Sequence, residues 1–129
     1  MIAVNPRTVV EVDIEGSKFK IGILPYGKRV EIQSLAHFNR EGTNPLQVQE
    51  LLKQSYEYVR WGVKGHSDLR YSDGSVVEFK SEKTKIGEVE YDIVSPETME
   101  VYAAGSKLLS VLCSEVTKMN YPSGEEVKK

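Results

Sequence analysis

The side chains best suited to catalysis or metal binding are two histidines and one cysteine. His37 is followed by Glu41 after four residues, and His66 is followed by Asp68 after two. Neither spacing is a recognisable metal-ligand pattern, and both histidines fall in polar segments where a solvated imidazole is usual. Cys113 falls deep inside an expected helix, far from the helix N-terminus or the base that would activate a thiolate. The sequence therefore predicts no metal site and no catalytic cysteine.

Motifs for phosphate binding and acyl transfer are not found in the sequence, which contains no GxxxxGK[ST], GxGxxG or GxSxG pattern. The segment 61–65, WGVKG, has two glycines and a lysine, but it follows an expected helix instead of opening one. Glu88, Glu90 and Asp92 alternate along one expected strand and fit a solvated edge. We therefore predict that the chain is not an enzyme and holds no cofactor.

A cluster of basic residues near aromatic side chains raises the question of nucleic-acid binding, because such sheets can bind single strands. The cluster comprises Lys18, Lys20, Lys28 and Arg29, with Tyr26 and Phe38 nearby. Acidic neighbours offset these lysines, and the whole chain has 17 basic and 19 acidic residues, a net charge of −2. We do not expect nucleic acid to be the partner.

Composition places the chain among globular proteins. Its 129 residues fit one domain, and 40% are hydrophobic while 28% are charged. A single cysteine excludes an intrachain disulfide and suits a reducing compartment. No apolar run approaches the roughly 20 residues of a membrane span, and the N-terminus does not read as a signal peptide. We expect a protein that is cytoplasmic or assembled in the cytoplasm, with no membrane partner.

Periodicity predicts an α+β fold that begins with an antiparallel meander. Alternating apolar residues define three strands at residues 8–14, 18–23 and 29–33, with turns at residues 15–17 and 24–27. An amphipathic helix then starts at Asn44-Pro45, with Asn44 as its cap, and ends at the glycines at positions 62 and 65. Its apolar side is expected to cover the meander. Residues 35–44 are expected to form a polar loop.

The second half predicts a hairpin at residues 68–79 around Asp73-Gly74, a solvated connection at 81–88 and a strand within 86–94. Ser95 and Pro96 then begin one long C-terminal helix that runs to about Asn120. Residues 1–120 are expected to form a single domain, and residues 121–129 a disordered tail.

Three segments of this half, taken in order, resemble a known family. They are YVRWGVKG at 58–65, YSDGSVVEF at 71–79 and SPETM at 95–99. An apolar helix, a W-x-V-x-G turn, an Asp-Gly hairpin and a Ser-Pro-Glu helix start follow one another in the same way in the tail assembly chaperones of long-tailed bacteriophages. The resemblance covers residues 58–119, about half of the chain.

The resemblance implies a non-catalytic role in the cytoplasm of the bacterial host. Such chaperones bind the helical tape measure protein during tail assembly, shield its apolar stripe and help recruit tail tube subunits. Two alternatives remain open, a structural or adaptor subunit of the phage particle and a small nucleic-acid-binding protein. Amphipathicity alone indicates Trp61, Leu108 and Leu112 as partner-binding residues, and edge strands make a homo-oligomer possible.

Overall fold

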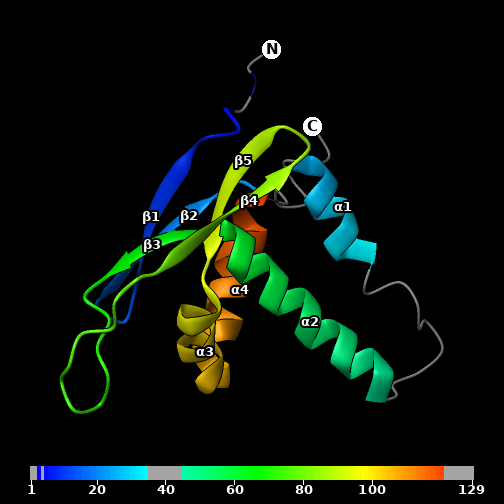
Figure 1. The fold of residues 1–129 in the computed structure, drawn as a ribbon. Helices are drawn as coiled ribbons and strands as arrows, with labels where there is room; N and C mark the ends of the chain where they lie inside the picture. The colour runs from blue at the N-terminus through cyan, green and yellow to red at the C-terminus, as the bar shows by residue number, and fades with distance from the viewer. Residues whose placement is uncertain (1–2, 4, 35–44, 121–129) are drawn as a thin grey trace.

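The structure, a computed structural model, describes residue 3, residues 5–34 and residues 45–120, and it describes the backbone alone for residues 45–51 and residue 106. The elements are β1 (Val9–Ile14), β2 (Ser17–Gly22), α1 (Tyr26–Ser34), α2 (Pro45–Gly62), β3 (Val63–Ser67), β4 (Ser81–Ile86), β5 (Val89–Val94), α3 (Pro96–Ala104) and α4 (Ser106–Asn120). Two antiparallel sheets and the helices pack together (Figure 1). The α+β class is confirmed, and the expected element order is confirmed in part.

The first sheet has the strand order β1-β2-β3. The predicted hairpin of β1 and β2 is confirmed, with Glu11 opposite Lys20 and Val12 opposite Phe19. Its turn places Gly16 at a φ of 89°, a conformation that glycine adopts without strain. Alternation along β2 buries Phe19 and Ile21 on one face and leaves Lys18 and Lys20 on the other.

The prediction of a third strand at residues 29–33 is wrong. Residues 29–33 belong to helix α1, and the place beside β2 is taken by β3, which pairs Lys18 with Ser67. The strand prediction depended on Val30 and Ile32 sharing a face. In the helix they diverge, so that Ile32 enters the core at 1% exposure while Val30 stays 46% exposed. An alternation of only two apolar residues is too short to distinguish the two periods.

Helix α2 begins at Pro45 as predicted, whereas the expected cap Asn44 and the expected loop at 35–44 lie outside the described residues. The helix ends at Gly62, and β3 follows at once, so the expected turn at 61–65 is wrong. Helix α2 packs on α4 and β5. The helix that packs against β2 of the first sheet is α4 (Figure 1). The predicted cover for the first sheet therefore comes from the other end of the chain.

The second sheet is the hairpin of β4 and β5. Residues 81–86 were expected to be a solvated connection, and this is wrong because they form β4, whose residue Lys83 lies opposite Asp92. Between β3 and β4, the Asp73-Gly74 turn is present, and the Gly74 N–H donates to the Tyr71 carbonyl at 3.0 Å. Its two arms are joined by the isolated bridge of Arg70 with Val76, and the Val77 N–H donates to the Leu69 carbonyl at 2.9 Å. The predicted hairpin at 68–79 is therefore present as a short antiparallel turn, without extended paired strands.

The long C-terminal helix is two helices. Ser95 caps α3 as predicted, its hydroxyl accepting from the Thr98 N–H, but Gly105 has extended angles of −113° and 119° and separates α3 from α4. Helix α4 ends at Asn120 as predicted, and the expected tail lies outside the described residues. Within the described residues, no helix is both long and apolar enough to cross a membrane.

The side chain of Asn120 connects the end of the last helix to the first sheet. Its buried side-chain amide accepts from the Leu24 N–H at 2.8 Å and donates to the carbonyls of Val116, at 2.8 Å, and Gly22, at 3.3 Å. The last residue of α4 is thereby bonded to the end of β2. The surrounding core includes Phe19, Ile21, Leu24, Ile32, Val59, Val63, Val94, Met99, Tyr102, Leu112 and Val116.

Candidate interaction surface

The residues predicted to contact a partner lie largely inside the molecule. Leu112 is 0% exposed and Trp61 is 5% exposed, while Leu108 is half-buried against the core. The centroid of the Trp61 ring lies 6.0 Å from that of the Tyr91 ring, and Lys28 Nζ lies over the Trp61 ring at 4.8 Å from its centroid. The apolar stripe that suggested these residues is used by the chain's own core, so Trp61 and Leu112 offer no surface to a partner in this structure.

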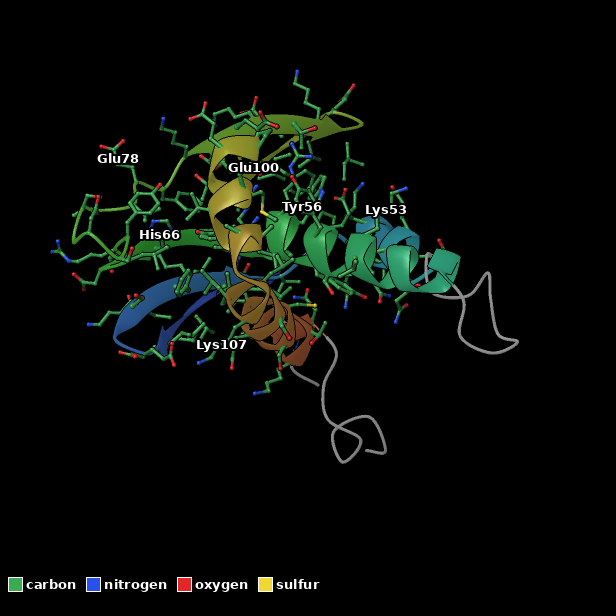
Figure 2. The ribbon with its side chains drawn as sticks, turned by 90° about the horizontal axis from the view of Figure 1, so that it is seen from below. Lys53, Tyr56, His66, Glu78, Glu100 and Lys107 are labelled. Atoms are coloured by element: carbon green, nitrogen blue, oxygen red, sulfur yellow. The ribbon has the colours of Figure 1, made fainter. Side chains whose placement is uncertain are left out.

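His66 is a half-buried residue of β3, so the expectation of a solvated loop histidine is wrong. Its Nε2 lies 2.8 Å from the Val77 carbonyl and its Nδ1 lies 2.6 Å from the Tyr102 hydroxyl. Because a carbonyl can only accept, Nε2–H is the donor, and Nδ1 accepts from the tyrosine. The imidazole, seen beside α3 in Figure 2, joins three segments of the chain and is saturated by these bonds.

The cysteine and the carboxylates form no reactive cluster in the described part of the chain. Cys113 lies half-buried on α4, and burial raises the pKa of its thiol, which disfavours the thiolate. Among the described residues, no group of three or more His, Cys, Asp or Glu side chains is placed to hold a metal ion. His37 lies outside those residues.

Exposed apolar side chains instead collect around three adjoining hollows near the start of β1, which we call the β1 surface. The hairpin hollow, of about 380 Å³, lies between residues 6–9 and β5. The middle hollow, of about 360 Å³, shares Pro6 and Ile23 with it. The helix hollow, of about 270 Å³, shares Met119 with the middle one and lies between β1 and α4. Four large apolar side chains that line these hollows are at least 46% exposed: Val9, Val10, Tyr26 and Val89.

The hairpin hollow also contains charged groups. Lys64 crosses from β3 over Gly22, and its Nζ donates to the Asp92 carbonyl at 3.2 Å. Removal of this ammonium from water lowers the pKa of Lys64, an effect that nearby Asp92 partly opposes. The carboxylates of Glu90 and Asp92 each lie 3.3 Å from Lys83.

Sequence reasoning missed the β1 surface because its parts come from both ends of the chain. One local signal was available. Val9 and Val10 are consecutive in a strand, so their side chains must point to opposite faces and one cannot reach the core. In the structure both are about half exposed, at 47% and 46%.

Comparison with known proteins identifies no relative: no family model, no curated protein and no solved structure matches this chain.

Proposed function

We propose that this chain is a non-catalytic, protein-binding factor of phage tail assembly that holds the tape measure protein in the cytoplasm of the bacterial host. The order of the sequence segments at 58–65, 71–79 and 95–99 suggests the family, although residues 61–65 form the end of α2 and the start of β3 instead of a turn. The β1 surface supports the mode of action. Tail tube subunits are the second partner that this role implies.

The observation that carries the proposal is the gathering of Val9, Val10, Tyr26 and Val89 around adjoining hollows. An amphipathic helix binds a protein by laying its apolar side chains into such depressions. The helix hollow suits one anchor of a helical partner, because Val10, Val12 and Met119 line it. Glu115 and Lys118 at its edge pair with each other at 3.3 Å and leave the depression without net charge.

The experiment is co-expression of the full chain with a helical fragment of the tape measure protein from the same phage. We expect the fragment to stay soluble and to co-purify. Val10→Asp and Val89→Asp should each reduce the recovered fragment, because a carboxylate would be buried under the partner helix. Circular dichroism checks that each variant is folded.

Val76→Asp is the matched control. Val76 is 56% exposed, lies on the segment between β3 and β4, and lines none of the three hollows of the β1 surface. This variant should recover as much fragment as the parent chain. A fragment that remains insoluble, or equal losses in all three variants, would contradict the proposal.

A subunit that stays in the phage particle is the second candidate, because the same apolar surface would serve a permanent contact. Mass spectrometry of purified particles separates the two roles. An assembly factor should be missing from mature tails, whereas a subunit should be present in stoichiometric amounts.

A further inference from the structure

The amine of Lys64 has unusual surroundings for a lysine of this chain. Its Nζ donates to the backbone carbonyl of Asp92 at 3.2 Å, and among the described residues no carboxylate lies within salt-bridge distance of it. Five other lysines each pair with a carboxylate: Lys28, Lys80, Lys83, Lys107 and Lys118. A hydrogen bond to a neutral carbonyl stabilises an ammonium less than an ion pair does, so Lys64 holds its extra proton less firmly.

The fold also fixes the Lys64 side chain and takes it partly out of water. Its methylene stem lies over Gly22, where an added Cβ would be 3.0 Å from Lys64 Cε. Burial lowers the pKa of the amine, and the nearby carboxylate of Asp92 opposes part of this shift. The free base is the form that attacks a carbonyl carbon, and partial burial is how proteins make a lysine nucleophilic at neutral pH.

The amine borders a hollow that can hold a small molecule. The hairpin hollow has a volume of about 380 Å³, within the range usual for small-molecule sites. Apolar residues line it beside Lys64, namely Pro6, Val9, Ile23 and Val89. Since Val9 and Val89 are each 47% exposed, a molecule from solution can reach the hollow and the amine.

The charges on the wall of this hollow balance. Arg7 and Lys64 are its cationic residues, and Glu90 and Asp92 are its anionic residues. Tyr91 is the remaining titratable residue on the wall. A charged ligand gains little from such a wall, whereas an uncharged molecule with an apolar part can pack on the apolar residues.

We propose that Lys64 is a covalent binding site for small aliphatic aldehydes, which it holds as an imine in the hairpin hollow. The lone pair of the neutral Nζ adds to the aldehyde carbon and gives a carbinolamine. Loss of one water, which carries away the aldehyde oxygen and both amine protons, then leaves the C=N bond. The alkyl group packs on Val9 and Val89. The inference goes beyond the proposed function, since it concerns a small molecule and needs no partner protein.

The test is reductive alkylation of the full chain at neutral pH with isovaleraldehyde and sodium cyanoborohydride, which reduces the imine to a stable secondary amine. Peptide mapping by mass spectrometry measures the labelled fraction of each lysine separately. Lys64 should be labelled several-fold faster than Lys85, an exposed lysine of β4 that does not line the hollow. In guanidinium chloride, which unfolds the chain and removes the hollow, the two lysines should be labelled at nearly the same rate.

Two comparisons separate the parts of the site. Formaldehyde has no alkyl group to pack in the hollow, so it should label Lys64 and Lys85 more evenly than isovaleraldehyde does. Asp92→Asn should increase the labelling of Lys64 several-fold, because it removes the carboxylate that favours the ammonium and keeps the backbone carbonyl to which Nζ donates. Glu88→Gln is the matched control, since Glu88 belongs to the same hairpin but does not line the hollow, and it should change nothing.

Equal labelling of Lys64 and Lys85 in the folded chain would overturn the inference. A preference for Lys64 that persists in guanidinium chloride would also overturn it, because the fold would then not be its cause. The same holds for an equal preference with both aldehydes, and for labelling of Lys64 that does not rise in Asp92→Asn above that in Glu88→Gln. Circular dichroism checks that both variants are folded.

Discussion

Gly62 of α2 and Val116 of α4 approach so closely that a Cβ added to the glycine would lie 2.5 Å from Val116 Cγ1. The two helices cross at this point, and the absence of a side chain at residue 62 allows the crossing. Immediately afterwards the chain enters β3, so the same residue sets where α2 lies and where the third strand begins. Gly62, which was predicted to end the helix, therefore also allows α2 and α4 to pack closely.

Gly62→Ala should lower the free energy of unfolding by about 1–3 kcal/mol, the usual cost of overpacking a core. Urea unfolding followed by circular dichroism measures the change. Gly105→Ala is the control, because an added Cβ there meets no heavy atom within 4 Å. The double substitution of Gly62→Ala with Val116→Ala should cost less than the sum of the single changes, since the two sites touch. Additive losses would contradict the contact.

Tyr102→Phe should lower the free energy of unfolding by about 1–3 kcal/mol, because His66 Nδ1 would lose its buried donor. Tyr91→Phe serves as the control, since the Tyr91 hydroxyl has no hydrogen-bond partner among the described residues. Thermal unfolding of both variants measures the difference. Equal small losses would show that the bond between Tyr102 and His66 contributes little.

Stability should also fall at alkaline pH because of Tyr102. Burial raises the pKa of this phenol above its ordinary value of 10.0. The folded state therefore retains a proton that the unfolded state releases, and stability is complete below about pH 10 and declines as the pH rises further. The decline is at most about 1.4 kcal/mol per pH unit for one group. Urea midpoints at pH 9 and pH 11 should differ less in Tyr102→Phe than in the parent chain.

Arg60→Met should destabilise the chain more than Glu82→Gln does. The Arg60 guanidinium pairs with Glu82 and also donates to the Val94 carbonyl at 3.2 Å, tying α2 to β5. A half-exposed ion pair contributes about 1 kcal/mol or less, whereas a charge-assisted bond to a carbonyl contributes about 1.5–3 kcal/mol. Urea unfolding of the two variants compares these contributions. Equal losses would mean that the ion pair dominates.

Lys64→Met should raise stability slightly, by less than about 1 kcal/mol, although it removes the bond to Asp92. The lowered pKa of Lys64 means that the fold disfavours its charged form, and this penalty disappears with methionine. Thermal unfolding at pH 7 measures the gain, with Lys85→Met as the control. A marked loss of stability would show that Lys64 is primarily a structural residue.

The elements that sequence could predict are those with strong local signals. Several alternating residues defined β1 and β2, a proline opened α2, and Ser95 capped α3 through its own hydroxyl. These features depend on residues that are close in the sequence, so they can be predicted without knowledge of distant contacts.

The missed elements depend on distant contacts. Residues 63–67 contain a glycine and a histidine and become a strand because they pair with β2. Residues 81–86 are almost entirely polar and become a strand because β5 pairs with them. The β1 surface was missed for the same reason, since Met119 and Val10 meet only in the folded chain.

The bond from the Leu24 N–H to Asn120 joins residues 96 positions apart. On the ribosome, the first hairpin would emerge long before its partner is synthesised. Its inner face, with Phe19 and Ile21, is fully covered only after α3 and α4 have been synthesised, because Phe19 packs on Tyr102 of α3 and both residues belong to the common core. The native core therefore cannot be completed until residues 106–120 have been synthesised, and factors that hold the partly made chain would affect the yield.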